Sequence, residues 1–450
     1  MKILPEILES TETITQIRRN IHAHPELRFE EKRTAELVAE ALSSWGIPVF
    51  NGLGKTGVVG RIDGELGPGK MIGLRADLDA LPLQEKNTFA HASTNPGKMH
   101  ACGHDGHTAM LLGAAQYLSN HREFMGSIIF IFQPAEEGGA GAQKMIDDGL
   151  FEQFPCDAVF GMHNWPGLGE GHFGVTSGPM MASSNEFSIE IQGKGGHAAL
   201  PHNSADPIMA GVQIAQALQT IITRNKRPVD AAVISITQFH AGKTSNVIPD
   251  TAMLGGTVRT FTLEVLDLIE RRLHEISNQV AGAFDCKATI EFKRNYPPLI
   301  NHEKETEFAS KVMKELVGEK RVNTRIDPTM GAEDFAFMLL KKPLFMAMSM
   351  NMSISLHWKC QANSFAHHIT QASCPSPPLL RPHPSSFPAS SRHDILEGIT
   401  CDHMHLFYCP VKCTYSLMIH TERSSLDACG ANTLDACGAN SLICIQTAPH

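Results

Sequence analysis

Residues 127–133 read SIIFIFQ, and this run constrains the fold more than any other stretch of the chain. An extended strand turns alternate side chains to opposite faces, so a run that is apolar throughout must be covered on both faces. A second short apolar run covers residues 158–163. Apolar residues recur at helical spacing over 34–45, and residues 140–148 can form another helix. Strands that alternate with helices predict an α/β fold with a mainly parallel sheet.

The middle of the chain has a different pattern. Residues 187–192 alternate apolar and polar side chains, as expected of a strand with one exposed face. Asp206 can cap a helix that has Pro207 at its first position. The remaining expected elements are strands at 231–239, 252–261 and 287–293 and helices at 207–224 and 263–284. This βαββαβ order is typical of a small ferredoxin-like α+β domain. We predict one domain over residues 1–182 and 295–345, with the ferredoxin-like domain inserted over 183–294.

Residues 346–450 continue neither pattern. Residues 351–450 hold eight of the 11 cysteines, eight prolines and nine histidines, but 11 charged residues. The sequence LDACGAN at 426–432 recurs at 434–440, which is far too short a period for a solenoid repeat. We expect an aberrant, disordered tail without packed elements. A metal-binding tail is the alternative, but the cysteines do not form paired C-x₂₋₄-C knuckles.

Charge and hydropathy limit the partners of the chain. The 38 Lys and Arg against 47 Asp and Glu give a formal net charge of −9, which does not indicate a nucleic-acid-binding surface. No window approaches the roughly 18–20 continuous apolar residues of a membrane span. The first ten residues, MKILPEILES, lack the charged end and apolar stretch of a signal peptide. We therefore expect a cytoplasmic protein with neither nucleic acid nor membrane as a partner.

The densest group of reactive side chains lies at residues 100–107, which read HACGHDGH. Three imidazoles and a thiol within eight residues are ligands that suit zinc-like ions. The alternative is a turn whose histidines only bond the backbone. We disfavour it because four donor groups are packed together.

Two other segments supply further candidate ligands. Glu136 and Glu137 follow the apolar run at 127–133, and His163 stands at the end of the run at 158–163. In open α/β sheets, ligands bind outside the carboxyl ends of the strands. Two adjacent carboxylates can divide the work, since one can bind a metal while the other transfers a proton. The alternative, a solvated acidic turn, does not explain why the acids follow an entirely apolar strand.

Six motifs together resemble the M20 metallopeptidase family, and most closely its amidohydrolase branch of hippurate hydrolases, N-acyl-amino-acid amidohydrolases and auxin-conjugate hydrolases. They are LRADLDALP at 74–82, MHACGHDGH at 99–107, QPAEE at 133–137, GKGGHAA at 193–199, NVIPD at 246–250 and GAEDF at 331–335. The resemblance covers residues 1 to about 343. It implies a zinc-peptidase-like catalytic domain, whose inserted domain serves as a lid and as the interface of a homodimer.

The resemblance also implies which residues perform the chemistry. Glu136 would be the general base and acid, and Asp77 would orient a metal ligand. Two divalent ions, zinc or manganese with cobalt or nickel as alternatives, would be bound by Cys102, His104, Glu137 and His163.

The same resemblance assigns the substrate contacts. His197 would reach across the dimer interface to the carbonyl oxygen of the substrate, and Asn246 and Arg259 would contact the substrate directly. Arg259 suits the carboxylate of an N-acyl amino acid, because a planar guanidinium can bind it through two hydrogen bonds. Without the resemblance, Asn246 and Arg259 would be interpreted as a strand-end cap and an exposed strand cation. The expected reaction is hydrolysis of the amide bond, which releases a carboxylic acid and an amino acid.

The resemblance ends after residue 343, where the family has a further strand, a metal-ligating histidine and a terminal helix. We expect these elements to be lost, and His357 is the one candidate for the missing ligand. Our hypothesis is out-of-frame translation or a replaced carboxyl terminus, which an intact reading frame with an ordered tail would contradict. A catalytically impaired remnant is therefore the alternative to an active enzyme. An aminopeptidase is a third possibility, but it would need an anchor for a free α-amine.

Overall fold

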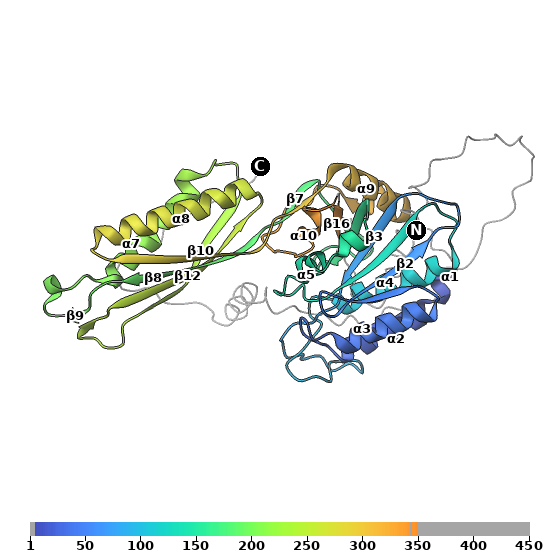
Figure 1. Ribbon diagram of the computed structural model, residues 1–450, viewed down its shortest axis with the longest axis horizontal. Helices are drawn as coiled ribbons and strands as arrows, with labels where there is room; N and C mark the ends of the chain where they lie inside the picture. The colour runs from blue at the N-terminus through green and yellow to red at the C-terminus, as the bar shows by residue number, and fades with distance from the viewer. Residues whose placement is uncertain (1–4, 343, 350–450) are drawn as a thin grey trace, which may run out of the picture. The chain divides into compact units, whose positions relative to one another are not determined.

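The computed structural model describes residues 5–342 and 344–349. Of the two compact units into which the chain divides, residues 1–380 and 381–450, only the first contains described residues. Two separate sheets organise this part of the chain (Figure 1). The described helices include none with the length and apolar character needed to cross a bilayer.

The larger sheet has eight strands in the order β1-β2-β4-β3-β5-β16-β6-β15. Its central strands β4, β3, β5 and β16 are parallel, while β1 and β2 extend it in antiparallel fashion. The predicted α/β fold with a mainly parallel sheet is therefore confirmed. The strands are β1 (Val49–Leu53), β2 (Gly57–Asp63), β3 (Met71–Asp77), β4 (Ser127–Gln133), β5 (Ala158–Asn164), β6 (Phe173–Gly174), β15 (Val322–Asn323) and β16 (Leu344–Ser349).

The position of β4 inside the sheet explains why its sequence is apolar throughout. Phe130 and Phe132 pack into a core with helix α4, whereas Ile129 and Ile131 pack into a second core on the opposite face of the sheet. All four side chains are fully buried. The helices of this part of the chain are α1 (Pro5–Glu9), α2 (Thr11–Ala23), α3 (Lys32–Ser44), α4 (His104–Asn120), α5 (Gly141–Asp147), α6 (Leu150–Gln153), α9 (Glu303–Val317) and α10 (Ala336–Leu339), with the short helix η3 (Glu319–Arg321).

The smaller sheet is antiparallel, in the order β10-β12-β8-β13, with α7 and α8 packed against it. Its βαββαβ order is the one that the sequence predicts, although the domain boundaries at 183 and 295 stay a prediction. Asp206 caps α7 by accepting the Ile208 N–H at 2.8 Å. The elements are β8 (Ser184–Gln192), α7 (Pro207–Thr220), η2 (Ile221–Asn225), β10 (Ala232–Ala241), β12 (Thr251–Thr260), α8 (Leu263–Ala283) and β13 (Lys287–Tyr296).

Short strands complete the described structure. Strand β9 pairs with β11, and β7 pairs with β14. Their bounds, and that of a short helix beside β9, are β7 (Gly178–Met181), β9 (Gly196–His197), η1 (Pro201–Asn203), β11 (Val247–Ile248) and β14 (Leu299–Asn301).

The end of the described chain corrects one expectation. We expected the strand after residue 343 to be lost, but β16 lies in the sheet between β5 and β6. Met346 and Ala347 are fully buried there, so this methionine-rich segment supplies the apolar strand that we expected to be lost. The strand runs past residue 345, where we placed the end of this domain. His357 and the repeat at 426–440 lie outside the described residues.

Candidate active site

The candidate residues meet at the carboxyl ends of three neighbouring parallel strands. Asp77 ends β3, Glu136 and Glu137 follow β4, and His163 lies next to the end of β5. Helix α4 begins at the same edge, and Gly103, with φ of +98°, makes the turn that leads from Cys102 into the helix. A residue with a side chain rarely adopts this backbone conformation. The expectation that these segments converge at the carboxyl edge of the sheet is met.

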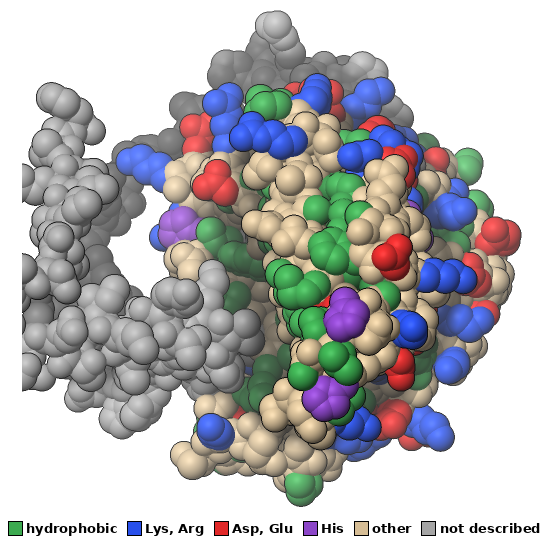
Figure 2. Space-filling model, turned by 90° about the vertical axis from the view of Figure 1, so that its left-hand side faces the viewer, with side chains coloured by type: hydrophobic (Ala, Val, Ile, Leu, Met, Phe, Trp, Pro, Cys, Tyr) green, Lys and Arg blue, Asp and Glu red, His purple; other side chains and the backbone are tan. Residues whose placement is uncertain are grey.

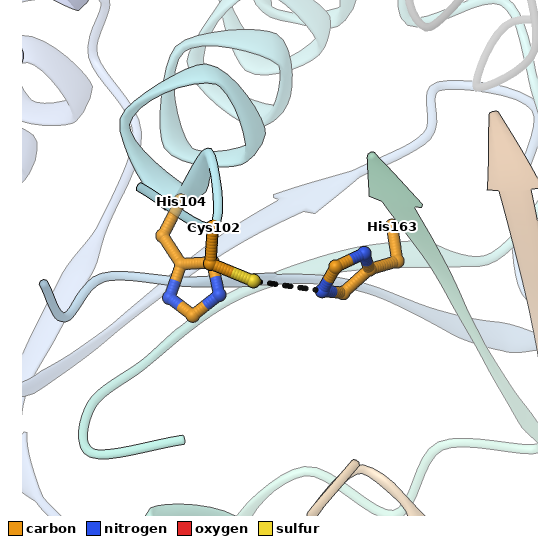
Figure 3. A group of neighbouring side chains, drawn as sticks. All are labelled: Cys102, His104 and His163. Atoms are coloured by element: carbon orange, nitrogen blue, oxygen red, sulfur yellow. Dashed lines mark hydrogen bonds between the residues drawn. The ribbon is translucent and has the colours of Figure 1, made fainter. Parts of the chain in front are cut away.

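Cys102, His104 and His163 form the core of the site, and Figure 3 shows that the Cys102 thiol points toward the His163 ring. Cys102 Sγ lies 3.4 Å from His163 Nε2. One donor atom from each of the three residues falls within 4.8 Å of the other two. A thiolate and two imidazoles at this spacing suit a zinc-like ion.

His104 is the second imidazole of this group, and it lies close to two carboxylates. Its buried Nε2 has no hydrogen-bond partner among the described residues. Nε2 lies 3.7 Å from Asp77 Oδ2 and 4.0 Å from Glu137 Oε1. Burial lowers the pKa of His104, but the carboxylate of Asp77 and the other nearby groups outweigh burial and hold the pKa well above its ordinary value. The surroundings of Nε2 therefore favour a positive charge, which a divalent metal ion can supply.

Burial affects the protonation of two other candidate ligands, Cys102 and His163. The Cys102 thiol must lose its proton to bind a metal, whereas His163 binds a metal as a neutral imidazole. Burial raises the pKa of the Cys102 thiol to about 11. Burial also lowers the pKa of His163 to about 3, so its imidazole is neutral. His163 Nδ1 faces its neighbour's carbonyl, Asn164 O, at 2.6 Å, which leaves Nε2 directed at Cys102.

Glu136 and Glu137 occupy different environments. Glu136 is 6% exposed, and burial together with the negative charges of Glu333 and Asp334 raises its pKa well above the ordinary range. Glu137 is more exposed, and its Oε1 is the atom that approaches His104. Tyr296 supports the turn by donating its hydroxyl to Glu136 O at 2.5 Å.

Asp77 lies at the centre of the site, with both of its carboxylate oxygens in use. Its Oδ1 lies 2.6 Å from His107 Nδ1, and its Oδ2 accepts a hydrogen bond from Arg75 Nη1 at 2.9 Å. His107 in turn accepts the Asn164 N–H at 2.8 Å through Nε2. Asp77 thus fixes the orientation of His107. Its Oδ2 lies 3.7 Å from His104 Nε2, farther than Oδ1 lies from His107 Nδ1.

Sequence reasoning missed two groups of residues beneath the site. Asp79, two residues after Asp77, contacts His104 and the backbone of both glutamates. Arg75 is buried in an ion-pair network with Asp77, Glu333 and Asp334. The motifs at 74–82 and 331–335 contain these residues as charged positions among apolar ones. No rule of sequence spacing predicts that two segments so far apart in the chain form ion pairs.

A pocket of about 620 Å³ opens onto these side chains. Its walls include Cys102, Glu136, Glu137 and His163, and β12 contributes Arg259. Burial lowers the pKa of the Arg259 guanidinium, and Glu186 on the next strand partly offsets this effect. The structure therefore brings Arg259 to the same pocket as the candidate ligands Cys102, Glu137 and His163 and the candidate base Glu136.

Two predicted site residues lie elsewhere in this chain. His197 belongs to β9 and is exposed, and it is absent from the described walls of the pocket. Asn246 is exposed beside it, since its carbonyl accepts the Ala198 N–H at 3.1 Å. Neither residue lines the described pocket of its own chain.

Comparison with known proteins gives a consistent picture. The model of peptidase family M20/M25/M40 matches residues 73–367, beyond residue 343 where we expected the resemblance to end. Hippurate hydrolase of Campylobacter jejuni is 44% identical over 358 residues, which cover 79% of this chain and 93% of that protein. N-acetyl-L-cysteine deacetylase of Bacillus subtilis is 43% identical over 328 residues, 72% of this chain and 76% of that protein.

Solved structures agree with the sequence relatives. A dinuclear metal binding peptidase of the M20 family from Bacillus subtilis superposes with a TM-score of 0.71 at 34% identity, covering 81% of this chain and 99% of that one. An aminohydrolase structure from Staphylococcus aureus gives a TM-score of 0.75 at 32% identity, covering 81% of this chain and 98% of that one. The chain therefore belongs to peptidase family M20/M25/M40.

Proposed function

We propose that the chain is a metal-dependent amidohydrolase that cleaves N-acyl amino acids, such as hippurate, into a carboxylic acid and an amino acid. One observation carries the proposal: a single pocket is lined by the Cys102 thiol, the His163 imidazole, the paired carboxylates of Glu136 and Glu137 and the Arg259 guanidinium. The names of the relatives, hippurate hydrolase and N-acetyl-L-cysteine deacetylase, support the same substrate class.

The ligands would be Cys102, His104, Glu137 and His163, which supply the sulfur, nitrogen and oxygen donors that zinc and manganese accept. Two bound divalent ions would polarise the amide carbonyl and make a water more acidic. The preferred metal is a matter for experiment, with cobalt and nickel as further candidates.

Glu136 would transfer the protons of the reaction. Its side chain lines the pocket, and its backbone carbonyl accepts a hydrogen bond from Tyr296. A carboxyl group whose pKa lies above its ordinary range holds a proton more readily near neutral pH. Glu136 would take a proton from the attacking water and deliver it to the nitrogen of the departing amino acid.

Arg259 would orient the substrate by binding the carboxylate of its amino-acid part. A guanidinium offers this group two parallel hydrogen bonds, and partial desolvation strengthens them. Asn246 and His197 of the partner subunit would complete the site at the carbonyl oxygen. This arrangement requires a homodimer.

The surface of the inserted segment suits such a dimer. Strand β10 is an edge of its sheet, and its residues 238–241 are exposed. Figure 2 shows apolar side chains and histidines gathered on one face of the molecule. The exposed large apolar residues in this part of the chain include Leu200, Met209, Val212, Phe239 and Val247. Exposed apolar groups next to an unpaired strand edge are typical of a protein interface.

Hydrolysis assays test the proposal. The chain is incubated with hippurate and acetyl-amino acids in the presence of Mn²⁺, Zn²⁺ or Co²⁺, and its bound metal is counted. We expect about two ions per chain and turnover that falls at least about 100-fold in Glu136→Gln, which loses proton transfer. Glu152→Gln is the control, because Glu152 is an exposed residue of α6.

The outcome also separates the alternatives. A folded chain that binds one ion or none and cleaves no substrate would be the impaired remnant. The formation of β16 removes one reason for that alternative, which assumed that this strand was lost. Cleavage of free peptides in preference to acylated amino acids would instead indicate an aminopeptidase. A cytoplasmic location stays a prediction from the sequence.

A further inference from the structure

Asp79 contacts three residues of the candidate site, His104, Glu136 and Glu137. It is 1% exposed. Its Oδ1 accepts the Glu136 N–H at 3.0 Å and its Oδ2 accepts the Glu137 N–H at 2.8 Å. His104 Nδ1 lies 3.3 Å from Oδ1.

These contacts decide which nitrogen of His104 is available for a metal. A carboxylate oxygen accepts hydrogen bonds, so Nδ1 of His104 carries the hydrogen that faces Asp79. Nε2 is then the nitrogen left to bind a cation, and it is the atom with no hydrogen-bond partner among the described residues. Asp77 cannot take over this task, because its oxygens are engaged by His107 and Arg75.

The turn that Asp79 holds is strained. Ala135, directly before the glutamates, has φ of +55°, in the left-handed region that residues with side chains rarely adopt. Such a conformation persists where surrounding contacts fix it. The Ala135 N–H is held by Glu31 Oε1 at 2.9 Å, and the next two N–H groups are held by Asp79.

We propose that Asp79 is a positioning residue that sets the separation of His104 from Glu136 and Glu137. It would thereby hold the candidate ligands His104 and Glu137 at a fixed distance from each other and from Glu136, the group that would transfer protons. Asp79 is not among the described residues that line the pocket, and it acts through the three residues that it contacts. The inference rests on the proposed function for its effect on turnover, but its effect on metal binding stands independently.

The exchange Asp79→Asn tests this role. Asparagine keeps the size of the side chain but replaces one accepting oxygen with an NH₂ donor. Depending on its orientation, this NH₂ group faces a backbone N–H group that needs an acceptor, or it faces the N–H of His104 Nδ1. We expect Co²⁺ affinity, measured by equilibrium dialysis, to fall about 10- to 100-fold, as for other residues that orient metal ligands. The Co²⁺ absorption spectrum should change, and kcat should fall more than KM rises. Glu26→Gln is the matched control, because Glu26 also accepts two backbone N–H groups, from Arg33 at 3.1 Å and Thr34 at 2.8 Å.

The results separate this inference from the proposed function. Folded Asp79→Asn with unchanged Co²⁺ affinity and spectrum overturns the positioning role, whether or not the parent chain is an enzyme. If Asp79→Asn does not fold, Asp79→Glu is measured instead. Its carboxylate is displaced by one methylene, so we expect a folded protein with weakened Co²⁺ binding, and unchanged binding overturns the role. If the parent chain hydrolyses no acyl-amino acid while Co²⁺ binding responds as expected, only the proposed function fails.

Discussion

The side chain of Asn301 forms a pair of hydrogen bonds with the backbone of Met346. Asn301 Oδ1 accepts the Met346 N–H at 2.8 Å, and Asn301 Nδ2 donates to Met346 O at 3.0 Å. Asn301 ends β14 and is 2% exposed, and Met346 lies in β16. The asparagine thus bonds both backbone groups of Met346, as a neighbouring strand would, and helps to hold β16, whose strand partners in the sheet are β5 and β6.

We expect Asn301→Ala to destabilise the protein by about 2–4 kcal/mol, because it leaves a buried N–H and a buried carbonyl of Met346 without partners. Urea unfolding monitored by circular dichroism measures the change. Asn278→Ala is the control, since Asn278 Nδ2 bonds His274 O at an exposed position of α8. Equal stability of the two variants would show that Asn301 does not secure β16.

The elements predicted best are those whose pattern is local. The apolar run of β4 required cover on both faces, and Ile129 and Phe130 indeed lie in opposite cores. Asp206 followed by Pro207 is a local helix start, and the structure contains it. These predictions succeeded because burial and capping depend on neighbouring residues.

The elements that sequence reasoning missed depend on partners far along the chain. Nothing near residue 346 indicates that Asn301 fastens it, and the segment was wrongly expected to be lost. Asp79 was missed for the same reason, since the groups that it binds lie 57 and 58 residues away. Such contacts become visible only when the topology brings β3 beside β4.

Arg259 should determine the preference for substrates that carry a carboxylate. We expect Arg259→Gln to lower kcat/KM for hippurate about 10- to 100-fold, the effect of losing charged hydrogen bonds of roughly 1.5–3 kcal/mol. Cleavage of the corresponding amide, hippuramide, should change little. Steady-state kinetics with both substrates make the comparison.

The control for Arg259 is the same exchange at Arg294. Arg294 is exposed on β13, forms an ion pair with Asp267 at 2.7 Å and is not among the described residues that line the pocket. Arg294→Gln should leave both substrates unaffected. An equal loss on hippurate and hippuramide in Arg259→Gln would mean that Arg259 does not recognise the carboxylate.

A dimer in which His197 serves the partner's site can be tested by complementation. Glu136→Gln and His197→Ala are expected to be inactive alone. In a mixed dimer, one site combines an intact Glu136 with His197 of the partner subunit. Random pairing gives half mixed dimers with one competent site of two, so about a quarter of the parent activity should return.

The matched control for complementation pairs Glu136→Gln with a chain that carries both exchanges. No site in that mixture holds an intact Glu136, so no activity should return. Differently tagged chains are co-expressed, and their pairing is verified by tandem purification. Inactive mixed dimers from the first pair would contradict action of His197 across the interface.

His22 forms a buried ionic cluster next to the amino end of α4. Its Nδ1 lies 3.0 Å from Asp105 Oδ2 and its Nε2 lies 3.2 Å from Glu85 Oε1. Arg18 also pairs with Asp105, at 3.0 Å. The ring of His100 lies 6.3 Å away and is neutral, because burial lowers its pKa to about 4. Burial would lower the pKa of His22 as well, but hydrogen bonds and charge from Asp105 and Glu85 outweigh it and raise the pKa above 6.5.

This raised pKa predicts how stability depends on pH. A histidine that binds its proton more tightly in the folded state stabilises the fold fully below the unfolded pKa of 6.5. That contribution is lost as pH rises through the higher pKa of the folded state. We therefore expect the difference in unfolding free energy between the parent chain and His22→Gln to be largest near pH 6 and to shrink as pH rises toward 9, measured by urea unfolding at each pH. His240→Gln is the control for the loss of an imidazole, because His240 is an exposed residue of β10. A His22→Gln difference that stays constant or grows across this range would mean that His22 is neutral in the folded protein.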